Sequence, residues 1–292
     1  MREQTLRLSG RTLNCAVGPK TGPPLVLLHG VMRCWRDFDP LLPTLIERWH
    51  VFAPDHRGHG KSGRGAASYR VADFAADAVA LIDEHVPGPA VLVGHSLGAM
   101  VAAVAAVERP DLVRALILED PPGSTLADGM RQSRFHLQFT NTERLLATAR
   151  DAESLTRDLA NMEVQRPSDG SVVRFGELRD ERTLRFSAEC LMQLDPAVLS
   201  TLTAGRWLEG LDWFGLLQKI ECPVLLLRAD PACGGMLNED EAARIPRLIP
   251  CCARVDLPGI GHSIHSSQPD KMLTLITNFF ATDQLHTTGT QS

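Results

Sequence analysis

Residues 90–108 read AVLVGHSLGAMVAAVAAVE, and this stretch decides the fold. Its first residues, 90–93, form a short apolar run of the kind found in strands buried on both faces. Small apolar residues continue from Leu97 to Glu108 and indicate a buried helix. Between the two lies Gly94-His95-Ser96-Leu97-Gly98, a Gly-x-Ser-x-Gly pentad. In this setting the pentad predicts a strained strand-to-helix turn that presents the Ser96 hydroxyl as a nucleophile.

Strand and helix patterns alternate on both sides of this turn. We expect an antiparallel hairpin over 5–17, buried strands over 25–28, 50–53, 113–118, 223–227 and 252–257, and helices over 38–48, 71–85, 238–248 and 268–281. This alternation predicts an α/β fold, with a mostly parallel sheet flanked by helices. Residues 124–215 instead carry only helical patterns, over 130–148, 151–162, 176–193 and 196–203. We therefore expect a helical cap over 123–215, inserted into a core formed by 1–122 and 216–292.

Size and composition restrict the class of protein. The chain has 292 residues, of which 44% are hydrophobic and 22% charged, and its formal net charge is −5. The mild acidity argues against a nucleic-acid partner, and no apolar run is long enough to span a membrane. The N-terminus lacks the apolar segment of a signal peptide. The seven cysteines form no C-x-x-C pair and no zinc-like cluster, so we expect free thiols in a cytoplasmic protein and no metal.

Ser96 needs a base, because a serine hydroxyl is a poor nucleophile at neutral pH. His262 is the best candidate among the histidines. It ends the loop Pro258-Gly259-Ile260-Gly261-His262, directly after the last expected strand. This position places the imidazole at the carboxyl edge of the sheet, where Ser96 also emerges and where open α/β sheets bind ligands.

The imidazole in turn needs an acid that holds its tautomer and stabilises the imidazolium. Asp120 ends the strand that follows the Ser96 helix, and Asp230 ends the next buried strand after the expected cap. Both strand ends can approach His262, and Glu119 is a third candidate. The spacing alone leaves the choice of acid open.

Four motifs in this order resemble the α/β-hydrolase superfamily, and more narrowly its capped esterase, lactonase and dehalogenase-like branch. They are Leu27-Leu28-His29-Gly30, Pro54-Asp55-His56-Arg57-Gly58-His59-Gly60-Lys61-Ser62, Gly94-His95-Ser96-Leu97-Gly98 and Pro258-Gly259-Ile260-Gly261-His262. Members with the acid after the seventh strand usually carry it where this chain has Ala232, so Asp230 stands two residues early. Members with the acid after the sixth strand carry it at the position of Asp120. The resemblance therefore favours Asp120, with Asp230 as the alternative.

The resemblance also implies the chemistry. An oxyanion hole would use the backbone N–H groups of Leu97, directly after the nucleophile, and of Val31, in the loop after His29-Gly30. The expected activity is that of a serine hydrolase that cleaves carboxylic esters or lactones through an acyl-enzyme, with no cofactor. The aromatic and methionine residues of the cap favour a small to medium apolar substrate, although they can equally fill the interface between cap and core. Dehalogenase and epoxide-hydrolase chemistry is disfavoured, because Ser96 stands where those enzymes need a carboxylate.

Three other interpretations remain to be weighed. The same triad serves C–C hydrolases, amidases and perhydrolases, and a hydrolase fold can also act as a small-molecule sensor. Residues 58–63 match the dinucleotide fingerprint G-x-G-x-x-G letter for letter. That fingerprint must open a helix directly after a strand, whereas here a loop pattern follows, so a structural turn is the better interpretation. The oligomeric state is left open.

Overall fold

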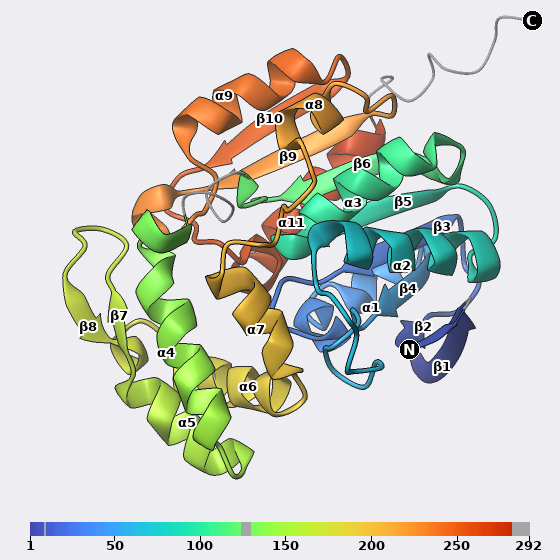
Figure 1. Cartoon of the computed structure of the whole chain (residues 1–292). Coiled ribbons are helices and arrows are strands. Elements are labelled where there is room, and N and C mark those ends of the chain that lie inside the picture. Colours follow the sequence, from blue (N-terminus) through green and yellow to red (C-terminus); the bar gives the residue numbers. More distant parts are fainter. Residues whose placement is uncertain (9, 124–129, 282–292) are drawn as a thin grey trace, which may run out of the picture.

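The computed structural model describes residues 1–8, 10–123 and 130–281 (Figure 1). The strands of its main sheet are Arg2–Leu8 (β1), Arg11–Val17 (β2), Pro24–Leu28 (β3), His50–Pro54 (β4), Ala90–His95 (β5), Val113–Glu119 (β6), Val224–Ala229 (β9) and Cys252–Leu257 (β10). Their order is β1-β2-β4-β3-β5-β6-β9-β10. β2 pairs antiparallel with β1 and β4, and all other neighbouring strands are parallel. The mostly parallel α/β sheet expected from the sequence is confirmed.

Helices cover both faces of the sheet. One face carries Val71–His85 (α2), Leu97–Glu108 (α3), Trp213–Leu217 (α8) and Glu239–Leu248 (α9). The other carries Trp35–Phe38 (η1), Leu42–Leu45 (α1), Ile264–Ser267 (α10) and Pro269–Ala281 (α11). Single turns of helix lie at Pro110–Leu112 (η2) and Pro231–Cys233 (η6).

β3 shows why a central strand reads as a continuous apolar run. Val26 and Leu28 belong to the core cluster on the α3 face, whereas Leu25 and Leu27 belong to the cluster on the α11 face. All four side chains are fully buried. Successive side chains of a strand point to opposite faces, so a strand covered on both sides needs an apolar residue at every position.

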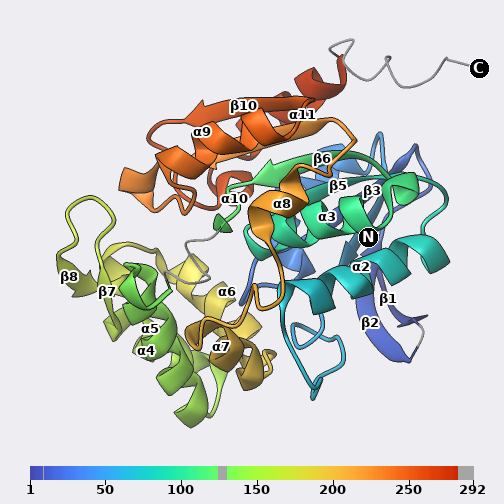
Figure 2. The ribbon, with the colours of Figure 1, turned by 45° about the horizontal axis from the view of Figure 1, so that its top comes forward.

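Between β6 and β9 the chain leaves the sheet. This segment contains Met130–Gln132 (η4), Phe135–Thr148 (α4), Ala152–Asn161 (α5), Phe175–Glu177 (η5), Glu181–Met192 (α6) and Pro196–Thr203 (α7), together with an antiparallel hairpin of Glu163–Gln165 (β7) and Val172–Arg174 (β8). In both ribbon views these elements lie together beside the sheet (Figures 1 and 2). We call residues 130–212 the helical insertion. None of the described helices has the length and apolarity needed to cross a membrane.

Two expectations for individual elements are wrong. Residues 38–48 do not form one helix, because only 42–45 is α-helical and 35–38 is a 3-10 turn. Pro40 and Pro43 explain this, since each lacks the N–H that a helix interior needs and crowds the residue before it. The hairpin β7–β8 was not expected, because strands of three residues with exposed flanks carry too short a pattern to detect.

Candidate active site

Ser96 occupies the turn between β5 and α3. Its φ of 54° and ψ of −114° lie where L-residues are rare and strained. A Cβ on Gly98 would stand 1.9 Å from the carbonyl oxygen of Leu28, and one on Gly94 would stand 2.3 Å from that of Gly98. Glycine is therefore required at both positions, and the turn has the sharp geometry that the pentad predicts.

His262 and Asp120 meet at the carboxyl edge of the sheet. The Nδ1–H of His262 donates to Oδ2 of Asp120 at 2.6 Å. Asp120 is fully buried, and its carboxylate also accepts backbone N–H groups from Met236 at 2.7 Å and from Ala229 and Leu237 at 3.3 Å. These donors come from β9 and the loop after it, and they hold the carboxylate in the orientation that faces His262.

Ser96 directly follows β5, the strand beside β6 in the sheet. Its backbone N–H donates to the carbonyl of Glu119, the residue before Asp120, at 2.9 Å. The rings of His95 and His262 lie 4.6 Å apart, and Nε2–H of His95 donates to the His262 carbonyl at 3.2 Å. Within the described residues no hydrogen bond joins the Ser96 hydroxyl to the His262 ring. In unliganded enzymes such a bond is often long and shortens only when substrate binds.

Asp230, the alternative acid, has different partners. Its carboxylate accepts the N–H groups of Ala232 and Gly259, each at 2.8 Å. The bond from Gly259, and after it the bond from Ala232, lowers the pKa of the Asp230 carboxyl. Its own N–H donates to the Ile260 carbonyl at 2.8 Å. Asp230 therefore ties the end of β9 to the loop that precedes His262.

Glu119, the third candidate, belongs to a buried charge cluster with His265 and Asp37. His265 Nδ1 lies 2.9 and 2.8 Å from the two Glu119 oxygens, and its Nε2 lies 3.2 Å from Oδ2 of Asp37. Burial lowers the pKa of His265, but the two carboxylates outweigh it and raise that pKa to about 10. Burial likewise raises the pKa of Asp37 and of Glu119, but His265 outweighs it and lowers both. The cluster is an ion triplet between the loop after β3, the end of β6 and α10.

This cluster, with His95, is also a group of possible metal ligands. One atom each of Asp37, His95 and His265 lies within 4.8 Å of the others. A charged His265 has no lone pair to offer a metal, because both of its nitrogens carry protons. Burial lowers the pKa of His95 to about 3, so its ring is neutral at physiological pH. Asp37 was not singled out from the sequence, because a carboxylate in the Trp35–Phe38 turn has no motif around it.

The loop after β3 passes directly against the Ser96 turn. A Cβ on Gly30 would stand 3.4 Å from the Ser96 Cβ and 2.8 Å from His95 Nδ1. Val31 is buried in this loop, and Met32 after it has a positive φ of 63°. Leu97 is the first residue of α3, so its N–H has no acceptor one turn earlier in the helix. Leu97 thus follows Ser96 directly, and Val31 follows Gly30, whose added Cβ would approach Ser96. Their role in an oxyanion hole stays a prediction.

The glycine-rich turn after β4 is built around Asp55. Asp55 accepts the N–H groups of Lys61 at 3.0 Å and Trp35 at 2.8 Å, and a Cβ on Gly60 would stand 2.2 Å from its carboxylate. The space inside the turn is therefore filled by a side chain of this protein. The close match to a dinucleotide fingerprint is a turn, as expected.

The aromatic residues expected to line an apolar pocket have different surroundings in the structure. Trp207 and Trp213 are buried in the core on the α3 face. Trp35 packs against the core on the opposite face. Phe175 also belongs to the core on the α3 face, with Arg179 over its ring. Phe186 lies beneath the side chains of Arg33 and Arg36. Trp207 and Trp213 therefore fill the interior, whereas Trp35 is only partly buried.

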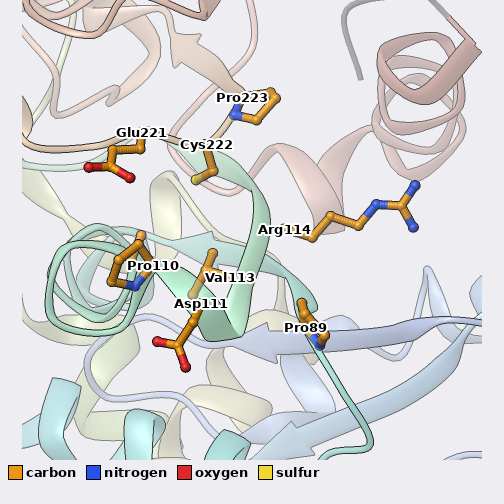
Figure 3. A pocket seen from close by; sticks show the side chains of 9 residues that line it. Pro89, Pro110, Asp111, Val113, Arg114, Glu221, Cys222 and Pro223 are labelled. Carbon is orange, nitrogen blue, oxygen red and sulfur yellow. The ribbon is translucent and has the colours of Figure 1, made fainter. Parts of the chain in front are cut away.

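A hollow of about 440 Å³ lies at the opposite edge of the sheet (Figure 3). Pro89, Val113 and Pro223, which line it, stand at the amino ends of β5, β6 and β9. Asp111 and Glu221 bring carboxylates to its rim. The hollow is separated from Ser96 and His262 by the length of the strands, so it is no part of the candidate active site.

Comparison with known proteins places the chain in a family. Residues 23–269 match the family model described as the alpha/beta hydrolase fold. The chain is 30% identical over 261 residues to a 2-(acetamidomethylene)succinate hydrolase of Mesorhizobium japonicum, covering 89% of this chain and 88% of the relative. The chain belongs to the α/β-hydrolase family.

Solved structures agree with this assignment. The crystal structure of an E-2-(acetamidomethylene)succinate hydrolase superposes with a TM-score of 0.75 at 25% identity, over 96% of this chain and 99% of that one. The enol-lactonase of Burkholderia xenovorans superposes with a TM-score of 0.72 at 15% identity, over 96% of this chain and all of its own. The second likeness concerns the fold alone.

Proposed function

We propose that this chain is a serine hydrolase of acyl compounds. Ser96 attacks the carbonyl carbon, His262 takes the hydroxyl proton, and Asp120 orients and stabilises the imidazolium. The N–H groups of Val31 and Leu97 stabilise the oxyanion, each by about 3 kcal/mol. The observation that carries the proposal is the 2.6 Å contact between His262 Nδ1 and Asp120 Oδ2, beside a strained serine.

The reaction has two steps. Attack by Ser96 expels the alcohol or amine, which takes its proton from His262, and leaves an acyl-enzyme. Water then gives a proton to His262 and attacks the acyl carbon. The bond to Ser96 breaks, the Ser96 oxygen takes that proton back from His262, and the acid is released. The chemistry needs no metal or organic cofactor. The helical insertion would cover the site as a cap and select the substrate.

Esters and lactones are the first candidate substrates, as expected from the motifs. Amides are the second, because the relative in Mesorhizobium japonicum is named as the hydrolase of an acetamido compound. A C–C hydrolase uses the same residues and remains an alternative.

The test is turnover of p-nitrophenyl acetate and butyrate, and of the matching p-nitroanilides, by wild type and by Ser96→Ala. We expect ester cleavage that Ser96→Ala abolishes, and the ratio of ester to anilide rates separates esterase from amidase. A fluorophosphonate probe should label wild type at Ser96 and leave the variant unlabelled. Equal ester turnover by wild type and Ser96→Ala would refute the proposal. Binding of these esters by wild type without turnover would also refute it and would indicate a small-molecule sensor.

A further inference from the structure

His95 joins the turn of the proposed nucleophile to the loop of the proposed base. It is the last residue of β5, directly before Ser96, and its side chain is 3% exposed. Its Nε2–H donates to the main-chain carbonyl of His262 at 3.2 Å, and the centres of the two rings lie 4.6 Å apart. A Cβ on Gly30 would stand 2.8 Å from His95 Nδ1. One buried ring therefore packs against the His262 loop on one side and the loop after β3 on the other.

The other nitrogen of this ring is not satisfied. Burial lowers the pKa of His95 to about 3, so the ring is neutral and carries one proton, on the Nε2 that donates to His262. Its Nδ1 is buried and accepts no hydrogen bond from any residue that the structure describes. A buried acceptor without a donor costs free energy, so a phenyl ring should be at least as stable in this place. The bond to His262, and not the free energy of folding, therefore explains a histidine here.

A second contact holds the same loop three residues further on. The backbone N–H of His265 donates to Oε1 of Glu119 at 3.0 Å. The backbone carbonyl of Glu119 accepts the Ser96 N–H at 2.9 Å, and Glu119 directly precedes Asp120. The loop that carries His262 is thus tied at two points to the strands that carry the nucleophile and the acid.

These ties act on the direction of the His262 ring. Asp120 accepts the Nδ1–H of His262 at 2.6 Å, which fixes one side of the imidazole. The bond from His95 fixes the main chain from which the ring projects. With both fixed, Nε2 of His262 keeps one direction, and proton transfer depends steeply on that direction because displacements of about 1 Å can cost about 100-fold in rate.

We propose that His95 is a positioning residue of the reaction, whose Nε2–H fixes the main chain of His262 so that the ring can take the Ser96 proton and return it. This inference rests on the proposed function, and it gives the second residue of the Gly-x-Ser-x-Gly pentad a role of its own. His95 acts only through His262, and its own proton does not move.

The test compares His95→Phe with His95→Gln on p-nitrophenyl acetate. Phenylalanine keeps the ring and loses the donor, whereas the glutamine amide can donate from nearly the same place. We expect His95→Phe to lower kcat about 10- to 100-fold, with KM within about twofold of wild type and a urea midpoint no lower than that of wild type. His95→Gln should recover most of the lost kcat. A role in folding alone would instead lower the urea midpoint and leave kcat per folded molecule unchanged.

His50→Phe is the matched control. His50 is also a buried histidine, but it stands at the amino end of β4, at the sheet edge opposite Ser96. This variant should keep the wild-type kcat and KM. Wild-type kcat in His95→Phe would overturn the inference, and so would equal losses of kcat in His95→Phe and His95→Gln.

The Nδ1–H proton of His262 provides a readout that does not depend on turnover. In protein labelled with ¹⁵N at histidine, its exchange with water should be at least about tenfold faster in His95→Phe than in wild type, because a loosened ring exposes it. His95→Gln should return the rate towards the wild-type value. Equal exchange rates in wild type and His95→Phe would also overturn the inference. If wild type cleaves no ester, the proposed function fails, while this exchange comparison still decides whether His95 positions His262.

Discussion

Arg134 reaches from the helical insertion to Gly235 in the loop after β9, where its Nη2 donates to the carbonyl oxygen at 2.5 Å. Its Nη1 donates to the carbonyls of Pro231 at 2.7 Å and Pro167 at 3.2 Å. The next residue after Gly235, Met236, gives its N–H to Asp120. One side chain of the insertion therefore holds the loop that orients the proposed catalytic acid.

Arg134→Met should loosen that loop. We expect kcat to fall about tenfold, with a smaller change in KM, because the acid loses its fixed orientation while the substrate contacts remain. Hydrogen exchange at the Met236 amide should become faster. Arg144→Met, an exposed position on the same helix that bonds to Asn141, is the control and should change neither. Unaltered exchange at Met236 would show that Arg134 does not support the loop.

Asp120→Asn and Asp230→Asn should separate the two candidate acids. Asp120→Asn should lower kcat about 10⁴-fold, since an amide favours the wrong imidazole tautomer. Asp230→Asn should lower kcat about tenfold at most, because the carboxylate of Asp230 contacts the backbone of the loop before His262 and not the ring. Steady-state kinetics on one activated ester decides between them. A larger loss in the Asp230 variant would make Asp230 the acid.

Ser96→Gly should be more stable than Ser96→Ala, although both lack the nucleophile. The φ of 54° at this position strains any residue with a Cβ, and glycine adopts it freely. We expect Ser96→Gly to exceed Ser96→Ala by about 1 kcal/mol in the free energy of unfolding, measured with urea. Equal stability of the two variants would mean that the turn stores no strain.

Gly98→Ala should prevent α3 from lying against β3. The added methyl group would overlap the Leu28 carbonyl oxygen, and neither backbone can move without disturbing the centre of the sheet. We expect a loss of about 3 kcal/mol or more in the free energy of unfolding, or failure to fold. Gly63→Ala is the control, because its nearest neighbour, the Thr12 carbonyl oxygen, is 3.4 Å from the new atom. A folded Gly98→Ala of wild-type stability would contradict the close approach.

The ion triplet of Asp37, His265 and Glu119 should make stability depend on pH. The pKa of His265 is raised to about 10 in the folded protein, against about 6.5 in the unfolded chain. The folded state therefore binds more protons between these values, and its stability should fall as pH rises from about 6.5 to 10. The lowered pKa values of Asp37 and Glu119 have their effect at acid pH, where stability falls as these carboxylates become protonated.

His265→Gln tests this dependence. Urea unfolding between pH 6.5 and 10 should show a clearly smaller slope in the variant than in wild type. His85→Gln, which removes an exposed histidine whose ring bonds to the Arg7 carbonyl, should retain the wild-type slope. Identical slopes in wild type and His265→Gln would show that His265 is neutral in the folded protein.

Local patterns were enough to predict the main features of the sheet and the Ser96 turn. The helices 71–85 and 97–108 have the predicted bounds, because periodic apolar residues and the pentad act within one element. The choice between Asp120 and Asp230 depended instead on the path of the loop after β9. That path is set by the backbone bond from Met236, 116 residues away from Asp120, and by Arg134 in the helical insertion.

The helical insertion departs from one strand of the sheet and returns to its immediate neighbour, where Glu119 on β6 pairs with Leu227 on β9. The chain leaves β6 at the carboxyl edge of the sheet and enters β9 at the amino edge, so the insertion lies in a parallel crossover, and doubling the length of such an excursion costs only about 0.6 kcal/mol of closure entropy. This segment can therefore lengthen, shorten or change its charges, provided that a contact such as that of Arg134 with the Gly235 carbonyl is kept. Sequence differences among homologues should concentrate in this insertion, so that the same catalytic residues can act on different substrates.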